Sequence, residues 1–531
     1  MTKLPEIISF ALVLALPLTL IVSSVVLLLF RHSLLREMGR LPPPLANKAV
    51  SAATVAPEWR AALTGGPGDG LQPTPFAPLL SYRQLRSQEI RFWGALLLLW
   101  LVIGLSAAVP YLLLTGLPLS PLRIMGFGMA LASAGWMALG LIARLPWRRA
   151  VGWILACVLL PGLVIWFSFK DQSAAAAGQL VASLLFLQGI PLTALILLIG
   201  VPALRATAPL LYPPVLLVTL LALVGQGALV ALDTFGISPH LLRLLPSADA
   251  LFLICHLLPV VAGVWLVHAA SRRIARSYRH RKFSDLSYTL GASCLVVLLF
   301  AVIPSWSANG GALLYLSPLL AWLWIPIVFT AITPRLLRPP PAPPPTLLVL
   351  RLFRRPGPVG WLFDQVVQRW RFLGPVLLIS AADLALRTLD ADELTGFIDG
   401  HLAQRFIASP SDLRLQIGAG ADDPDHDGRY RVHDLCCYDS SWQGVLEALL
   451  QRSQLVLMDL RGFQANNLGC LHELVRLAAS PGLSKVVLLV DRNTDRATAD
   501  AALADAPPIV WVDEQHSRHQ TMEALLQSLC S

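Results

Sequence analysis

The sequence predicts a polytopic α-helical membrane bundle followed by a cytoplasmic α/β domain of three layers with a mainly parallel sheet. The chain has 531 residues, of which 55% are hydrophobic and 14% charged, whereas soluble domains carry roughly 25% charged residues. Long apolar runs end near Leu337, and runs of strand length follow from Pro345 onward. The net charge of the chain also changes from positive to negative at this boundary. The first 345 residues carry 24 basic and 9 acidic side chains, and the last 186 carry 17 and 23.

Nine stretches are apolar over the roughly 20 residues that a membrane-spanning helix needs. They are residues 7–30, 93–115, 122–143, 151–168, 179–203, 212–232, 248–269, 286–304 and 312–334. The first is too long for the apolar region of a signal peptide, and arginines follow it instead of a small-residue cleavage site. We therefore expect a retained helix and a membrane domain over residues 1–337, with a cytoplasmic loop at 31–92.

The Lys and Arg residues between these stretches predict the orientation of the chain. Alternate loops, beginning with 31–92, hold 18 of them, and the opposite set holds only Arg123, Lys170 and Arg243. Cytoplasmic loops are the basic ones, so the N-terminus should lie outside and the C-terminal domain in the cytoplasm. The basic excess thus reflects topology, and the acidic C-terminal part further argues against a nucleic-acid partner. We expect a protein integral to a bacterial inner membrane.

A proline-rich linker at 338–345 precedes the predicted α/β domain, residues 346–531. Strands are expected at 346–352, 375–380, 428–434, 454–460, 484–490 and 508–513, and helices at 360–371, 392–405, 441–452, 467–479, 494–504 and 518–529. Several strands are apolar on both faces, which is typical of buried parallel strands. Alternation of strands and helices then predicts a three-layer arrangement.

Ligands bind such sheets outside the carboxyl ends of the strands. Polar residues follow three strands there: Ser380 with Asp383, Asp459 with Arg461, and Asp491 with Arg492. Arg461 would hold a phosphate while Asp459 orients a ribose hydroxyl. The alternative is a local Asp–Arg ion pair beside a glycine turn. The domain has no GxGxxG, Walker A, HExxH or GxSxG motif, which removes the main support for dehydrogenase, P-loop, zincin and hydrolase functions.

A second candidate site is an acidic loop with the spacing of a calcium-binding loop. Asp423, Asp425 and Asp427 alternate before Gly428, and Asp434 takes the twelfth position. Alternate carboxylates can turn toward one Ca²⁺ ion. The alternative is a solvated acidic connection between two elements. The seven cysteines show no zinc-binding spacing and are expected to be reduced.

Two segments resemble Toll/interleukin receptor (TIR) domains, which have a flavodoxin-like fold. VLLISAAD, Val376 to Asp383, looks like their opening strand. The segment Leu449 to Leu474 resembles the TIR pattern of a helix ending in Ser, an apolar strand, a loop and a helix that carries Cys-x-x-Glu-Leu. Ser453, Cys470, Glu473 and Leu474 occupy the matching positions. The resemblance covers residues 375–531.

This resemblance implies a function for Glu473. In enzymatic TIR domains the matching glutamate supports cleavage of the nicotinamide–ribose bond of NAD, where a carboxylate stabilises positive charge on the ribose. Asn466 or Asn467 would cap the helix that carries it, and the helix N-terminus would favour a phosphate. The alternative is a surface glutamate favoured by the helix dipole. TIR domains generally self-associate, so self-association is expected here.

Three hypotheses follow. The first is a membrane-anchored TIR-like effector that cleaves NAD or a related nucleotide. The second is a non-enzymatic module for protein interaction or nucleotide sensing. The third is a channel or transporter with a regulatory domain, which the scarcity of charge within the apolar stretches disfavours.

Overall fold

The chain forms two compact units in a computed structural model. Contacts group Met1–Leu28, Trp93–Thr333 and Asp390–Thr395 into a first unit, and Leu29–Phe92, Pro334–Leu389 and Gly396–Ser531 into a second. The structure describes residues 4–38, 57–60, 81–143, 145, 147–169, 178, 200, 202–245, 247–309, 312–337, 344–351, 360–379, 391–417, 422–480, 482–503, 507–515 and 517–530.

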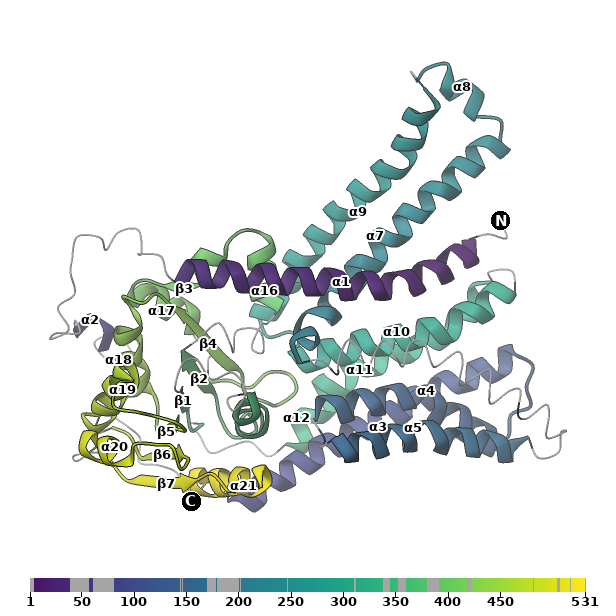
Figure 1. The fold of residues 1–531 in the computed structure, drawn as a ribbon. Helices are drawn as coiled ribbons and strands as arrows, with labels where there is room; N and C mark the ends of the chain where they lie inside the picture. Colours follow the sequence, from purple (N-terminus) through teal and green to yellow (C-terminus); the bar gives the residue numbers. More distant parts are fainter. Residues whose placement is uncertain are drawn as a thin grey trace. The chain divides into compact units, whose positions relative to one another are not determined.

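The first unit is helical (Figure 1). Its elements are α1 (Leu4–Met38), α3 (Tyr82–Leu114), α4 (Pro121–Ile142), α5 (Trp147–Ser168), α7 (Pro202–Thr234), α8 (Ser238–Leu242), α9 (Ala248–Arg279), α10 (Asp285–Ala308), η1 (Leu313–Leu323), α11 (Trp324–Ile327), η2 (Val328–Ile332) and α12 (Thr333–Leu336). The ends of α1 and α3 nearest the loop at 31–92 belong to the second unit, as does α12 after Thr333. The last four elements follow one another as a single run that changes helix type, and Pro318, Pro326 and Pro334 interrupt its hydrogen bonding.

Seven helices in the described part of the chain are long and apolar enough to cross a membrane. They are Phe10–Met38, Tyr82–Leu114, Pro121–Ile142, Arg148–Ser168, Ala248–Arg279, Asp285–Ile303 and Leu313–Leu336, and they coincide with seven of the nine expected spans. The expected span at 179–203 lies outside the described residues. That at 212–232 falls in α7 (Pro202–Thr234), of which the stretch Thr207–Leu223 is apolar within the fully described residues.

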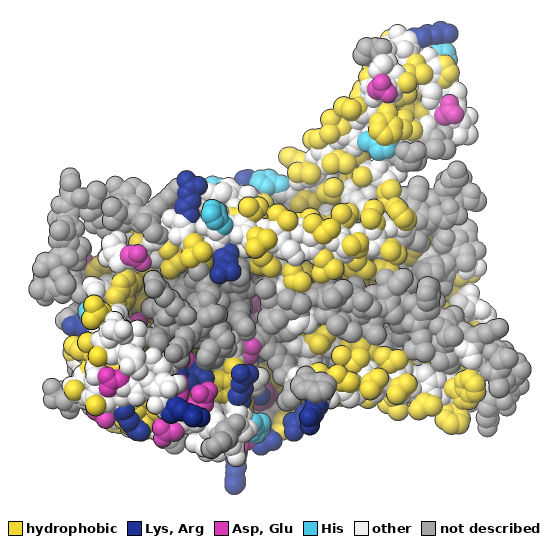
Figure 2. Space-filling model, viewed as in Figure 1, with side chains coloured by type: hydrophobic (Ala, Val, Ile, Leu, Met, Phe, Trp, Pro, Cys, Tyr) yellow, Lys and Arg dark blue, Asp and Glu magenta, His cyan; other side chains and the backbone are white. Residues whose placement is uncertain are grey.

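Side chains on the outside of these helices are apolar, as a lipid-facing surface requires. Figure 2 shows hydrophobic side chains covering much of α1 and α9. On α9, Leu258 and Trp265 are 69% and 68% exposed. Inside the unit, small residues allow close helix packing. A Cβ atom at Gly135 of α4 would collide with the ring of Trp100 on α3.

The second unit contains a seven-stranded, entirely parallel sheet. Its strands are β1 (Leu347–Arg351), β2 (Val376–Ile379), β3 (Phe406–Ile407), β4 (Val432–Cys437), β5 (Leu455–Asp459), β6 (Lys485–Val490) and β7 (Ile509–Asp513). All six expected strands are present, although β4 lies later than the expected 428–434. The two-residue edge strand β3 was not predicted.

The strand order is β3-β4-β2-β1-β5-β6-β7. Without the short β3, the remaining six strands have the order 3-2-1-4-5-6 that is found in dinucleotide-binding doubly wound sheets. In the flavodoxin-like order 2-1-3-4-5, a domain opening at β2 would place β2 beside β5. Here β1, which precedes the region of TIR resemblance, lies between them. The order reverses between β1 and β5, which is therefore the topological switch point of the sheet.

Helices pack on both faces of the sheet (Figure 1). They include α2 (Pro57–Arg60), η3 (Phe363–Val367), α14 (Gln368–Trp370), η4 (Leu402–Arg405), α17 (Pro410–Ile417), α18 (Trp442–Arg452), α19 (Leu468–Ala478), α20 (Arg496–Ala502) and α21 (Arg518–Cys530); α16 (Ala391–Ile398) is divided between the two units. The expected helix 392–405 is in fact α16 and η4, separated by a turn at Gly400, whose φ of 76° favours glycine.

Two described parts of the loop expected at 31–92, namely α2 and residues 82–92, belong to the second unit. Trp59 of α2 packs on the core of this unit, and a Cβ atom at Gly444 of α18 would lie 2.6 Å from its ring. Residues 82–92 are the start of α3. Their contacts with the α/β unit are described below.

Candidate functional site

The switch point is lined by charged residues at the ends of its two strands. Arg351 ends β1 and Asp459 ends β5, and their Cα atoms are register partners. Both residues are 4% exposed. Charged groups are rarely buried without a partner, so this edge of an otherwise apolar sheet is chemically distinct.

Asp459 holds Arg461 in a bidentate ion pair. Arg461 Nε donates to Asp459 Oδ1 at 2.9 Å and Nη2 donates to Oδ2 at 2.7 Å. Its Nη1 donates to Glu514 Oε1, just beyond β7, at 2.7 Å. Burial disfavours the charged guanidinium, but these hydrogen bonds raise the pKa of Arg461. The guanidinium also lies over the ring of Trp361, 5.8 Å from its centroid. This geometry is the local ion pair that the sequence left open as the alternative to phosphate binding.

The loop that carries Arg461 is fixed to the next strand end. Gly462, at φ 71°, donates its N–H to Asp491 Oδ1 at 2.8 Å. Asp491 also accepts from the Thr494 hydroxyl at 2.9 Å, and that hydroxyl lies 3.0 Å from the carbonyl oxygen of Leu460. Asp491 thus holds the loops after β5 and β6 together, and Arg461 is positioned by both.

Glu473 lies in the second turn of α19, and it is buried, with only 2% of its surface exposed. It is therefore not the surface glutamate of the alternative interpretation. Within the described parts of the chain, its Oε2 has no hydrogen-bond partner. Burial raises the pKa of Glu473 to about 8, and the positive charge of Arg351 opposes this increase. The carboxyl is thus mostly protonated at neutral pH and sensitive to nearby charge.

Cys470 lies one turn before Glu473 and is 5% exposed. Burial raises the pKa of its thiol, and the negative charges of Glu473 and Asp459 raise it further. Cys470 and Glu473 share the buried face of α19, and charges at the ends of β5 and β1 shift their pKa values. The thiol stays protonated and is not activated as a nucleophile.

The other predicted nucleotide-binding residues are not all part of this site. Ser380 and Asp383 lie outside the described residues. Asn467 is in the N-cap position of α19 but does not cap it; its side-chain oxygen accepts from the backbone N–H of Gln464 at 2.8 Å instead. Candidate residues missed by the sequence analysis are Arg351, Glu514 and Trp361. Arg351 had a detectable signal, because it is a charged residue at the end of an otherwise apolar strand.

The burial of Glu473 also had a signal in the sequence. Cys470, Glu473, Leu474 and Leu477 recur at the i, i+3, i+4, i+7 spacing of one helix face. All four are buried in the structure. Glu473 therefore lies on the buried, otherwise apolar face of α19. A favourable interaction with the helix dipole, which would account for an acidic residue on the surface, does not account for one in this position.

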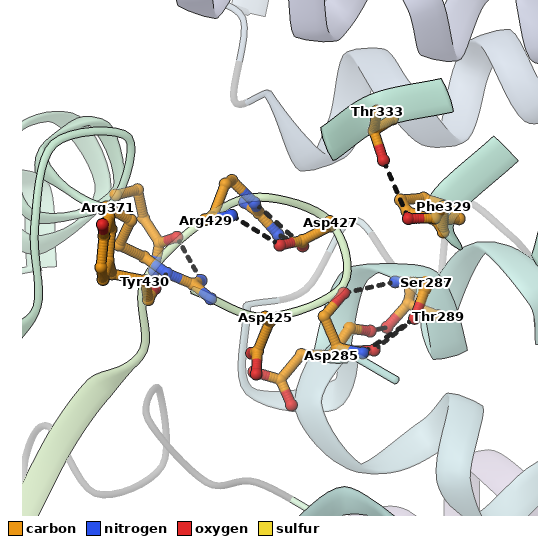
Figure 3. A network of polar contacts seen from close by, with 12 residues as sticks. Asp285, Ser287, Thr289, Phe329, Thr333, Arg371, Asp425, Asp427, Arg429 and Tyr430 are labelled. Atoms are coloured by element: carbon orange, nitrogen blue, oxygen red, sulfur yellow. Dashed lines mark hydrogen bonds and ion pairs between the residues drawn. The ribbon is translucent and has the colours of Figure 1, made fainter. Parts of the chain in front are cut away.

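The predicted calcium loop has a different role. Asp427 is paired with Arg429, with Oδ2 2.8 Å from Nη2 (Figure 3). Asp425 accepts from Arg431 Nε at 2.8 Å. Asp423 lies outside these pairs, and Asp434 lies on β4. No group of three His, Cys, Asp or Glu side chains within the described residues is placed to hold a metal ion. Arg429 and Arg431 thus form ion pairs with two of the four carboxylates that were expected to bind Ca²⁺.

Comparisons of the chain with protein-family models, curated proteins and solved structures found no match. The fold and the site therefore define only a class. The protein combines a helical unit, with seven helices able to cross a membrane, and a doubly wound α/β unit with a buried ionisable cluster at its switch point.

Proposed function

We propose that the protein is a membrane-anchored signalling or effector protein whose cytoplasmic α/β unit binds a nucleotide at the switch point and cleaves its N-glycosidic bond. Glu473 is the proposed catalytic residue and NAD the proposed substrate. The observation that carries this proposal is the buried carboxyl of Glu473 beside the switch point, one oxygen of which has no hydrogen-bond partner among the described residues. Buried, perturbed carboxyl groups at such an edge are candidate catalytic groups.

The raised pKa of Glu473 suits a cationic substrate. The nicotinamide ring of NAD carries a positive charge next to the bond that breaks. This charge would favour the ionised carboxyl, which then stabilises the positive charge that develops on the ribose. The electron pair of the C1′–N bond leaves with nicotinamide, which becomes neutral. Water adds to C1′, and its proton passes to the Glu473 carboxylate or to solvent.

The membrane part of the proposal follows from the sequence. Nine spans, an outside N-terminus and 18 basic residues in alternate loops would place the α/β unit in the cytoplasm of a bacterium, at its inner membrane. The lipid bilayer is then a permanent partner. The TIR resemblance of residues 375–531 suggests that the protein also self-associates and that association activates it.

A non-enzymatic function is the second candidate, and one observation favours it. Three hydrogen bonds from Arg461 reach the carboxylates of Asp459 and Glu514. The arginine is therefore held in a structural ion pair and is not free to hold a phosphate for hydrolysis, which favours a module for protein interaction or nucleotide sensing.

Nicotinamide release separates these functions. The full chain in lipid nanodiscs is incubated with NAD, both as purified and after induced clustering, beside Glu473→Gln and the control Asp500→Asn, an exposed acid on α20. We expect release by the wild type and the control and at least about a hundredfold less by Glu473→Gln. Equal release by Glu473→Gln would refute the catalytic role. NAD binding without release by the clustered wild type would favour the sensing function.

A further inference from the structure

One face of the start of α3 is built to contact the α/β unit. Tyr82, Leu85, Glu89 and Phe92 recur at spacings of three and four residues, which places them on one side of a helix. Leu85 and Phe92 are each 1% exposed, whereas Ile90 on the other side is 63% exposed. We call the side of residues 82–92 that carries Tyr82, Leu85, Glu89 and Phe92 the docking face; its apolar residues are buried, whereas Ile90 on the opposite side is exposed.

Near its C-terminal end, the docking face makes an aromatic contact and an ion pair with the α/β unit. The ring of Phe92 packs edge-on against Phe372, with centroids 5.3 Å apart, and the guanidinium of Arg429 lies 5.1 Å from the Phe92 centroid. One turn earlier, Glu89 forms an ion pair with Arg369 of α14 at 3.1 Å. Aromatic packing and a partly buried ion pair together fix the rotation of the helix.

The beginning of the docking face contacts a second element. The Tyr82 hydroxyl donates to Glu523 Oε1 of α21 at 3.3 Å, and Arg86 lies 4.0 Å from the same oxygen. Arg369 links the two contacted elements, because its Nη1 lies 2.9 Å from the sulfur of Met522 on α21. The docking face therefore rests on α14 and α21 together.

Both of these elements lead to Arg461 at the switch point. The helical residues 360–362, which run into η3 and α14, carry Trp361 over the Arg461 guanidinium. On the other side, Glu514 precedes α21 and accepts a hydrogen bond from Arg461 at 2.7 Å. A shift of α14 or α21 would therefore change the packing or the ion pairing of this arginine.

We infer that α3 is a coupling helix, and that its docking face transmits movement of the helix to Arg461. Beyond Phe92 the same helix continues as an apolar stretch of the length that a membrane span requires. No proline interrupts α3 before Pro110, and an unkinked helix is able to carry a movement of one end to the other. This inference does not depend on which ligand the switch point binds.

Hydrogen exchange with a charge swap tests the inference without a ligand. The full chain in nanodiscs is compared with Glu89→Arg, Arg369→Glu, the double swap and the control Ile90→Ala. We expect each single variant to speed amide exchange in residues 460–467 by about tenfold, the change expected when one charged contact is lost. The double swap should restore protection, and Ile90→Ala should leave it unchanged.

A different pattern of hydrogen exchange would contradict the coupling role of α3. If the single variants speed exchange only within 82–92 and 360–373, while 460–467 keeps wild-type protection, the docking face is an attachment and not a coupling element. Phe92→Leu keeps the bulk of the side chain but removes the ring over Arg429, so it gives the same comparison if a charge variant fails to fold. Loss of nicotinamide release alone would bear on the proposed function and not on this inference.

Discussion

Arg351 and Asp459 end neighbouring parallel strands as register partners, and the charge of Arg351 lowers the pKa of Glu473 on the helix that follows β5. The last residues of β1 and β5 and one turn of α19 thus form a single electrostatic unit. Asp459 is neutralised by Arg461, so Glu473 is the group in this unit whose protonation responds to a bound charge.

The stability of the α/β unit should fall as pH rises, because of Glu473. Its pKa is raised from 4.5 to about 8 in the folded protein. The folded state therefore holds this proton more tightly than the unfolded state, and the stabilisation is present below about pH 4.5 and lost as pH rises to about 8. Between pH 4.5 and 7 the loss is on the order of 3 kcal/mol.

Glu473→Gln should remove this pH dependence. Melting temperatures of the two proteins in nanodiscs, measured from pH 5 to 8, should converge at low pH, with the wild type becoming relatively less stable as pH rises. Parallel curves would show that the Glu473 carboxyl has an ordinary pKa. Asp500→Asn serves as the control and should follow the wild type.

Arg351→Met should raise the pKa of Glu473 further, because it removes the positive charge that opposes the effect of burial. The upper end of the pH range over which stability falls should therefore move upward, while its lower end stays at the unfolded pKa. The Arg351→Lys variant retains the charge and should keep the wild-type range. An unchanged range in Arg351→Met would mean that Arg351 does not act on Glu473.

The strands were predictable from sequence, but their order was not. Apolar runs such as Val486–Val490 identify buried strands, because both of their faces are covered. The position of β1 between β2 and β5 depends on pairing across about a hundred residues, which periodicity does not encode. The two residues of β3 are too short to show a pattern.

The candidate site was partly predictable. The resemblance identified Glu473, and the strand-end rule identified Asp459 and Arg461. The pairing of Arg461 with Glu514 requires the sheet order, because Glu514 follows a different strand. The calcium-loop hypothesis considered only carboxylate spacing, whereas Arg429 and Arg431 are close enough in the chain to pair with Asp427 and Asp425.

Asp427→Asn should destabilise the α/β unit strongly. Asp427 is 0% exposed and pairs with Arg429, so the substitution leaves a buried guanidinium without its counter-charge. Loss of one partner of a buried pair costs about 3–5 kcal/mol. Asp422→Asn is the matched control, because the Asp422 side chain is 52% exposed in its pair with Arg452; its cost should be about 1 kcal/mol or less. Equal effects on melting temperature would contradict this account.

Gly444→Leu should displace Trp59 from the α/β unit. Even a Cβ atom at this position would lie 2.6 Å from the Trp59 ring, so a larger side chain cannot be accommodated without movement of α2. Tryptophan fluorescence should shift to the red, and proteolysis near residues 57–60 should increase. Trp59→Ala combined with Gly444→Leu should be less destabilising than Gly444→Leu alone. Additive effects would argue against the contact.

The orientation can be tested with a reporter fused after Ser531 that is active only in the cytoplasm. The basic loops predict activity. Activity of a second fusion, to a reporter that works only outside the cytoplasm, would contradict the predicted topology. It would also contradict the proposed access of the α/β unit to cytoplasmic nucleotides.

The central claim is that Glu473 responds to a cationic nucleotide at the switch point, and calorimetry of NAD binding tests it most directly. Titrations of the full chain at pH 7 use an NAD analogue that keeps the nicotinamide cation but cannot be hydrolysed, and they give the number of protons released when repeated in two buffers with different ionisation enthalpies. Because Glu473 is mostly protonated before binding, the wild type should release up to about one proton as the nicotinamide cation binds. Glu473→Gln should bind the analogue without this release. Absence of binding, or equal proton release by both proteins, would contradict the account.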